Sequence, residues 1–148
     1  MTTTNFLNMS KLKVLLVDDD EVDYMNVKRA FKKNNLEHVL EYQPNGLDAI
    51  NYLKSVEKRS DLPQVVLLDI NMPKMNGHEF LEELRSDDKL KHIVVYVLTT
   101  SSQNSDIDKA YKNQVSGYLV KPLDFVEFKS TVKRLDDLWE VQKFPDFS

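Results

Sequence analysis

The sequence predicts an α/β fold, namely a doubly wound parallel sheet of five strands in a (βα)5 arrangement. Short apolar runs alternate with longer amphipathic segments along the chain, and three of these runs are continuous instead of alternating with polar residues. Continuous apolar runs are typical of parallel strands that are buried on both faces. The amphipathic segments are long enough to act as crossover helices between such strands.

Each strand is predicted from an apolar run that polar or turn-forming residues interrupt. In chain order, the expected strands are Lys13–Val17, roughly Val39–Tyr42, Val65–Leu68, Ile93–Leu98 and Gly117–Val120. The expected helices follow the strands and span residues 22–34, 46–58, 78–86, 105–113 and 124–140. The last helix carries apolar residues three and four positions apart, which form one apolar face: Phe125, Phe128, Val132, Leu135 and Trp139. The polar segment 54–64 contains Pro63 and is expected to be a surface loop.

Length and composition indicate one globular domain. The chain has 148 residues, of which 41% are apolar and 30% are charged. We expect a lead-in at residues 1–10, which lacks the features of a signal peptide, a main domain at 11–140 and a tail at 141–148. The absence of cysteine fits a cytoplasmic protein. The net charge of −4 argues against a nucleic-acid partner, and no apolar run is long enough to span a membrane.

Polar side chains follow four of the five predicted strands. Asp18 and Asp19 follow the first strand, Asp69 the third, Thr99 the fourth and Lys121 the fifth. The carboxyl ends of parallel strands lie at one edge of a sheet, and ligands bind outside that edge. Carboxylates bind Mg²⁺, while a hydroxyl and an amine can contact phosphoryl oxygens. This set of residues therefore predicts transfer of a phosphoryl group to a carboxylate.

The first strand runs into five carboxylates within six positions: Asp18, Asp19, Asp20, Glu21 and Asp23. Neighbouring carboxylates repel one another, so a bound cation or a helix N-terminus is needed to make such a cluster favourable. We assign the first two to the cation. We expect the other three to stabilise the N-terminus of the following helix.

Four motifs in order resemble those of response regulator receiver domains: DD at 18–19, LLDINMPKMNG at 67–77, LTTS at 98–101 and GYLVKP at 117–122. The resemblance extends from Lys13 to about Trp139 and implies a flavodoxin-like, CheY-like fold. It implies a phosphoprotein of two-component phosphorelay signalling, which accepts a phosphoryl group from a histidine kinase. The LTTS motif, the long segment before Asp69 and the tryptophan in the last helix are closest to stand-alone receivers associated with bacterial phytochrome-type histidine kinases.

The resemblance also implies roles for single residues. Asp69 would be the phosphoacceptor, and Mg²⁺ would be held by Asp19, Asp69, the backbone carbonyl of Asn71 and, through water, Asp18. Lys121 would pair with Asp69 at rest and with the phosphoryl group afterwards. The only catalysis implied is the protein's own phosphorylation and dephosphorylation, so we do not expect an enzyme in the usual sense.

The conformational response is also implied by the resemblance. Thr99 would move toward the phosphoryl group and Tyr118 would follow it inward, which would change the surface of the fourth helix, fifth strand and fifth helix for a downstream protein. Pro122 would follow a cis peptide bond. Thr100 stands where the family commonly has a smaller residue, which would narrow access to the acyl phosphate. Independently, Pro73 and the Asn76-Gly77 pair predict a turn that starts the third crossover, in which Gly77 is free to take a positive φ.

Two alternatives remain at this stage. The stretch DDDEV at 18–22 also matches the signature of haloacid dehalogenase-like phosphatases, with Asp18 as nucleophile and Asp20 as general acid. That reading leaves Asp69 without a role, and no acidic pair follows Lys121 in the expected place. The second alternative is a receiver-like binding module that works without phosphorylation. His38, His78 and His92 show no metal-ligand spacing and are expected at the surface or at its boundary.

The C-terminal tail carries more aromatic residues than one helix end requires. Trp139, Phe144 and Phe147 fall within nine residues, and Pro145 discourages continuation of the helix. Exposed apolar area of this kind favours association. We therefore expect the tail to pack on a second copy of the chain and form a homodimer.

Overall fold

Five parallel strands form a single sheet in the computed structural model, which describes residues 11–147. The strand order is β2-β1-β3-β4-β5, with β1 at Lys13–Val17, β2 at Val39–Gln43, β3 at Val65–Leu68, β4 at Val94–Thr99 and β5 at Gly117–Val120. The predicted fold class is confirmed. The expected lead-in at residues 1–10 and the final Ser148 lie outside the described residues.

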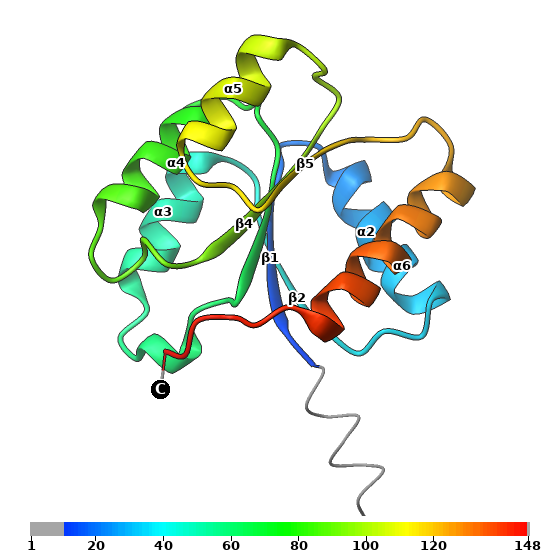
Figure 1. Cartoon of the computed structure of the whole chain (residues 1–148), viewed down its shortest axis with the longest axis horizontal. Coiled ribbons are helices and arrows are strands. Elements are labelled where there is room, and N and C mark those ends of the chain that lie inside the picture. The colour runs from blue at the N-terminus through cyan, green and yellow to red at the C-terminus, as the bar shows by residue number, and fades with distance from the viewer. Residues whose placement is uncertain (1–10, 148) are drawn as a thin grey trace, which may run out of the picture.

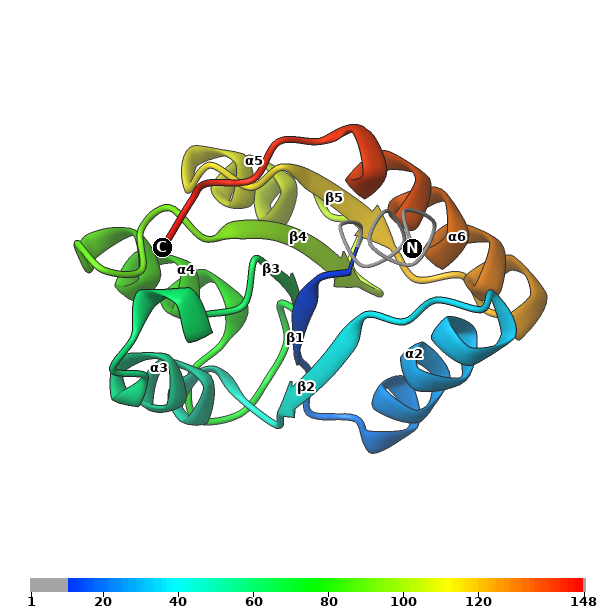
Figure 2. The same cartoon turned by 90° about the horizontal axis from the view of Figure 1, so that it is seen from below.

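Helices cover both faces of the sheet (Figures 1 and 2). One face carries α2 (Glu21–Lys33) and α6 (Phe125–Val141), and the other carries α3 (Gly46–Ser55), α4 (Gly77–Ser86) and α5 (Asn104–Lys112). The helix α3 is shorter than predicted, because the chain becomes extended at Val56 and then forms a short 3-10 turn at Arg59–Asp61. Lys89 donates a hydrogen bond to the Val56 carbonyl beyond the end of α3. None of the described helices is long and apolar enough to cross a membrane.

Two apolar layers explain why the strand sequences are continuous. Val14 and Leu16 of β1 pack with α2 and α6, while Leu15 and Val17 pack with α3 and α4. Successive side chains of a strand point to opposite faces, so a strand between two helical layers must be apolar at every position. The buried Trp139 belongs to the layer under α6.

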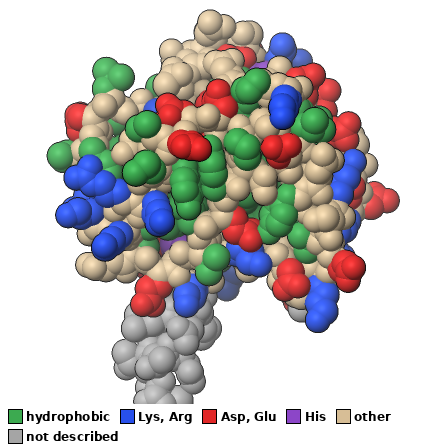
Figure 3. Space-filling view, turned by 180° about the vertical axis from the view of Figure 1, so that it is seen from behind, with side chains coloured by type: hydrophobic (Ala, Val, Ile, Leu, Met, Phe, Trp, Pro, Cys, Tyr) green, Lys and Arg blue, Asp and Glu red, His purple; other side chains and the backbone are tan. Residues whose placement is uncertain are grey.

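The edge strand β2 is partly covered by aromatic packing. Tyr24 of α2 stacks on Tyr42 of β2, with ring centroids 4.5 Å apart and planes tilted by 15°. Hydrophobic side chains gather in the middle of the face seen from behind in Figure 3. Stacking at this distance favours the pair beyond its buried area, so it helps to hold the start of α2 against the sheet.

The tail after α6 folds back on its own chain and covers most of the aromatic surface that was expected to bind a second copy. The tail runs along the edge where the strands begin, on the side of β4 and β5, from α6 toward α3 and α4 (Figures 1 and 2). Phe144 packs against the α2/α6 layer, and Phe147 is buried in the opposite layer. The guanidinium of Arg59 lies 5.4 Å from the Phe147 ring centroid. Trp139 and Phe147 are buried and Phe144 is half-buried, so less aromatic area is exposed than expected, and the homodimer stays a prediction.

Candidate functional site

Three carboxylates come together at the edge of the sheet where the strands end. Asp18 follows β1, Asp69 follows the adjacent strand β3, and each of Asp18, Asp19 and Asp69 offers an oxygen within 4.8 Å of the others. Asp18 and Asp69 are buried, whereas Asp19 is exposed. Hard oxygen donors at this spacing fit a divalent cation that is partly open to water. The sequence placed these three residues together, and the structure brings them together.

The backbone holds the two buried carboxylates in place. The Asp69 amide donates to the Val17 carbonyl at 2.9 Å, and the Asp18 amide donates to the Gln43 carbonyl at 3.2 Å, which extends the sheet past both strand ends. The Asp69 Oδ1 atom accepts from the Ile70 amide at 2.8 Å. The other oxygen, Oδ2, faces Lys121 at 3.5 Å. One oxygen of Asp69 is therefore fixed by the backbone, and the other is directed to the cationic side of the site.

Lys121 is nearer to two other carboxylates than to Asp69. Its Nζ atom lies 2.7 Å from Asp18 Oδ2 and 2.6 Å from Asp23 Oδ2, and its side chain is only 8% exposed. The Lys121 backbone is fixed by its amide, which donates to the Thr99 carbonyl at 2.7 Å. The expected contact with Asp69 is present but is the longest of the three. Asp23 is a site residue that sequence reasoning missed, although its place in the first turn of α2 was a signal.

The buried charges alter each other's pKa. Burial raises the pKa of Asp18 to about 7, and attraction to Lys121 offsets only part of this effect. Burial by itself would lower the pKa of Lys121, but its carboxylate neighbours, Asp18 above all, outweigh burial and raise it. The site therefore favours the charged form of Lys121 and disfavours the ionised form of Asp18. A divalent cation at the site would lower the pKa of Asp18, because it favours the ionised carboxylate.

The remaining acidic residues begin the helix α2, as predicted for Asp20. The Asp20 side chain accepts from the Val22 amide at 2.9 Å and caps the helix. The Asp20 amide in turn donates to Asp18 Oδ1 at 2.9 Å. Glu21 is exposed in the first turn, where a negative charge favours the helix dipole.

An open cleft of about 430 Å³ gives access to these groups, and Asp19, Asp69, Asn71, Thr100 and Lys121 are among the residues that line it. Thr100 is exposed beside the site, whereas Thr99 is fully buried at the end of β4. Asp18 is also fully buried, which is a poor position for a nucleophile that must meet a substrate in solution. Asp69 lines the open cleft and faces Lys121, so it is better placed than Asp18 to receive a group from solution.

Tyr118 is already turned inward in this structure. Its hydroxyl donates to the Ser101 carbonyl at 3.0 Å, and its ring packs against the apolar layer under α3, α4 and α5. Burial raises the pKa of Tyr118, while the bond to Ser101 opposes the shift. The bond links β5 to the loop after Thr99, so the residues expected to respond to phosphorylation are physically connected.

His78 of α4 lies at a boundary position, as expected, and is connected through Asp106 to the same loop. Asp106 accepts from the Ser101 hydroxyl at 2.6 Å and pairs with His78 Nε2 at 2.8 Å. The bond from Ser101, followed by that from His78, lowers the pKa of Asp106. The His78 side chain is 13% exposed. This network ties α4 and α5 to the loop that follows β4.

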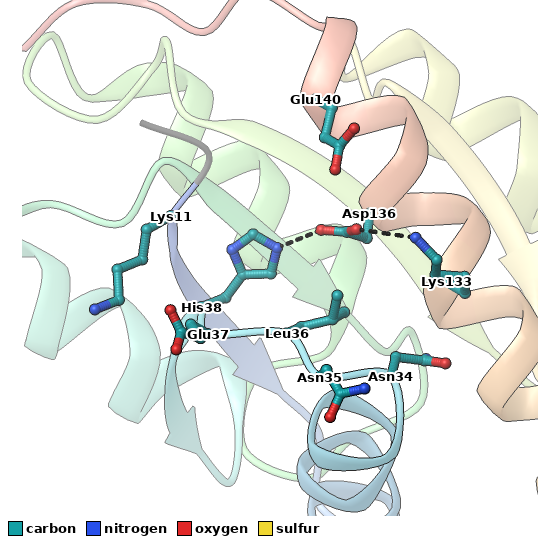
Figure 4. Close-up of a pocket in the computed structure, with 9 residues that line it drawn as sticks. All are labelled: Lys11, Asn34, Asn35, Leu36, Glu37, His38, Lys133, Asp136 and Glu140. Carbon is teal, nitrogen blue, oxygen red and sulfur yellow. Dashed lines mark hydrogen bonds and ion pairs between the residues drawn. The ribbon is translucent and has the colours of Figure 1, made fainter. Parts of the chain in front are cut away.

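A second cleft, of about 350 Å³, lies at the opposite edge of the sheet (Figure 4). His38 Nδ1 accepts from the Leu12 amide at 3.0 Å, and Nε2 bonds Asp136 of α6 at 2.7 Å. The His38 and Asp136 side chains are 4% and 7% exposed, and His38 as a whole residue is half-buried, in line with the boundary position expected for it. Lys133 lies 3.6 Å from the other Asp136 oxygen. Both ring nitrogens of His38 are satisfied, which marks a structural pair. His92 is exposed, as predicted.

One backbone expectation was wrong. No cis peptide bond occurs among residues 11–147, so Pro122 follows a trans bond, which is the usual form even before proline. Lys121 is directed instead by its ion pairs. Gly77 does not have a positive φ. Glycine is required there by close approach, because a Cβ would lie 2.5 Å from the Asp69 carbonyl oxygen and 2.8 Å from the Ile70 Cα atom.

Known proteins share this architecture. The family described as the response regulator receiver domain matches residues 14–133. The probable methanogenesis regulatory protein FilR2 of Methanothrix harundinacea is 39% identical over 127 residues, covering 85% of this chain and 82% of FilR2. The response regulator Rcp1 of Synechocystis is 33% identical over 128 residues, covering 85% of this chain and 87% of Rcp1.

Solved structures agree with the sequence relatives. The phosphorylated cyanobacterial phytochrome response regulator RcpA superposes with a TM-score of 0.82 at 30% identity, covering 92% of this chain and 99% of RcpA. The Mn²⁺-bound form of Rcp1 superposes with a TM-score of 0.81 at 32% identity, covering 91% of this chain and 99% of Rcp1. One of these structures is phosphorylated and the other holds a divalent metal.

Proposed function

Because the chain belongs to the response regulator receiver domain family, we propose that Asp69 accepts a phosphoryl group from the phosphohistidine of a sensor kinase. The single observation that carries this assignment is the convergence of Asp69, two further carboxylates and Lys121 in one open cleft. Receiver domains act in two-component signalling, so the proposal concerns which residues do the work in this chain. It includes no other enzymatic activity.

The chemistry is an in-line displacement at phosphorus. A carboxylate oxygen of Asp69 attacks, the phosphorus–nitrogen bond to histidine breaks, and its electron pair stays on the imidazole as an acyl phosphate forms. Oδ2 is the oxygen suited to this role, because Oδ1 already accepts from the Ile70 amide. The Lys121 ammonium would pair with one oxygen of the transferred group, and the Thr99 hydroxyl would donate a hydrogen bond to another.

Mg²⁺ is the proposed metal. Asp19 and Asp69 would bind it directly, Asp18 through water and Asn71 through its backbone carbonyl, which gives the hard oxygen set that Mg²⁺ prefers. When bound, the ion would supply positive charge to the phosphoryl oxygens. The Mn²⁺-bound form of the similar protein Rcp1 supports the binding of a divalent ion by this chain.

Output would pass through the surface of α5, β5 and α6. The bond from Tyr118 to the Ser101 carbonyl connects β5 to the loop after Thr99, so a shift of Thr99 toward the phosphoryl group would reach that surface and a downstream protein. The likeness to RcpA, a phytochrome response regulator, supports a phytochrome-type histidine kinase as partner and hence a cytoplasmic location. We assign residues 11–140 to the receiver domain and 141–148 to a tail.

The test is phosphorylation of the wild type and of Asp69→Asn by a histidine kinase. The wild type should take up label that hydroxylamine removes, as it removes acyl phosphates, and Asp69→Asn should take up none while its circular dichroism is unchanged. Asp88→Asn is a matched control, because Asp88 is a highly exposed carboxylate paired only with Lys91 in the described structure. Label that persists in Asp69→Asn would overturn the assignment, and label on Asp18 would favour the phosphatase alternative.

A further inference from the structure

The Lys121 ammonium is shared among three carboxylates, and Asp23 makes the shortest contact. The distances are 2.6 Å to Asp23, 2.7 Å to Asp18 and 3.5 Å to Asp69. An ammonium has three N–H donors and one charge. At rest, two of these contacts are close enough for charge-assisted hydrogen bonds, and the contact with the proposed phosphoacceptor is not.

Asp23 differs from Asp18 in its relation to the cation. The group that could hold a metal among the described residues consists of Asp18, Asp19 and Asp69, and Asp23 is not a member of it. A cation at that position would draw the Asp18 carboxylate toward itself, which weakens its hold on Lys121. Asp23 would keep its hold, because it is 24% exposed on the first turn of α2 and has no other hydrogen bond or ion pair through its side chain among residues 11–147.

A phosphoryl group on Asp69 needs the charge that Asp23 neutralises. The group brings nearly two negative charges to the side of Asp69 that faces Lys121. A carboxylate 2.6 Å from the ammonium lowers the positive potential at the phosphoryl oxygens, and it occupies one N–H donor. Both effects of Asp23 weaken the interaction between Lys121 and the phosphoryl group.

We propose that Asp23 is a positioning residue that retains Lys121 in a resting position and thereby weakens the hold of the site on a phosphoryl group. The inference rests on the proposed function of Asp69. It assigns to α2 a restraint on phosphorylation in addition to its packing role. Release of Lys121 from Asp23 is then a step that phosphorylation must drive.

The test is the affinity of Asp23→Asn for beryllofluoride, a phosphoryl analogue, at saturating Mg²⁺, measured by fluorine NMR or calorimetry. Asp23→Asn should bind roughly tenfold more tightly than the wild type, a factor on the scale of one charge-assisted hydrogen bond. Asp23→Ser replaces the carboxylate with a shorter, uncharged side chain and should show the same gain in affinity. A substitution that merely damages the structure weakens binding, so the direction of the change separates the two roles.

Glu21→Gln is the matched control, since it removes the same charge from the same helix turn, is exposed, and lacks an ion pair with Lys121 in the described structure. Its affinity should change less than twofold. Equal gains in Asp23→Asn and Glu21→Gln would show a general charge effect and overturn the proposal, as would unchanged or weaker binding by Asp23→Asn. Beryllofluoride binding that survives in Asp69→Asn would instead refute the proposed phosphoacceptor, so the two failures are distinguishable.

Discussion

The two edges of the sheet use buried aspartates in opposite ways. At the edge where strands end, Asp18, Asp23 and Asp69 share one ammonium, and Asp19 adds a further negative charge. At the edge where strands begin, Asp136 is matched by His38 and Lys133, and both nitrogens of His38 are paired. Negative charge in excess of its partners calls for a ligand, whereas a satisfied pair holds chain segments together. We call the edge where the strands end the responsive edge, because it can bind a ligand, and the edge where they begin the closed edge, because its polar groups are already paired.

The largest effect should come from breaking the closed edge with His38→Ala. This change leaves the buried Asp136 and the Leu12 amide without their partner and opens a cavity beside Phe31 and Trp139. We expect the free energy of unfolding to fall by about 3 kcal/mol in urea denaturation. His92→Ala, at an exposed histidine, should change it by less than about 0.5 kcal/mol. A similar, small loss in both variants would mean that the His38–Asp136 pair does not close this edge.

A smaller loss is expected when the tail is released from the same edge by Phe147→Ala. Phe147 is 9% exposed and packs in the α3/α4 layer, with Arg59 over its ring. The cost should be about 2 kcal/mol, below that of a central phenylalanine because the end of the chain can adjust. The exposed Lys143 provides the control Lys143→Ala. If thermal melts of the two variants coincide, the tail contributes no packing energy.

The smallest effect concerns the responsive edge and its pH dependence without metal. The pKa of Asp18 is raised to about 7 in the folded chain, against an ordinary value of 3.8. The folded state therefore binds a proton that the unfolded state has lost between these pH values, so stability falls as the pH rises through this window. The unfolding free energy of Asp18→Asn relative to wild type should increase by about 1 kcal/mol from pH 4.5 to pH 7 in EDTA.

Millimolar Mg²⁺ provides the control for this pH effect. A cation at the site keeps Asp18 ionised in the folded state, so the difference between the wild type and Asp18→Asn should lose its pH dependence. If the difference in unfolding free energy between the two proteins does not change with pH even in EDTA, Lys121 alone keeps Asp18 ionised from pH 4.5 to pH 7. The responsive edge would then be as satisfied at rest as the closed edge.

Much of the site could be predicted because its residues follow strands. Asp18, Asp69 and Thr99 each come directly after a buried apolar run, Lys121 follows the partly buried edge strand β5, and parallel strands bring such positions to one edge. Asp20 was predictable as a helix cap from its type and place. These assignments depend on local residue patterns and on strand direction, and both can be predicted from residues that are close together in the sequence.

Contacts between residues that are far apart in the sequence could not be predicted from local patterns. His38 and Asp136 are 98 positions apart, and Lys121 and Asp23 are also 98 positions apart. Gly77 is required by the approach of the Asp69 backbone, and Phe147 is buried because the tail crosses to the opposite layer.

The amino-acid order thus specifies strands, helices and the ring of polar residues at one edge, because each of these follows from short-range periodicity and strand polarity. The three-dimensional arrangement alone selects Asp23 over Asp69 as the nearest partner of Lys121 and places the last aromatics within the chain. The physical reason is that hydrogen bonds, ion pairs and close packing require atomic positions that are fixed to within a few tenths of an ångström, between residues that lie far apart in the sequence.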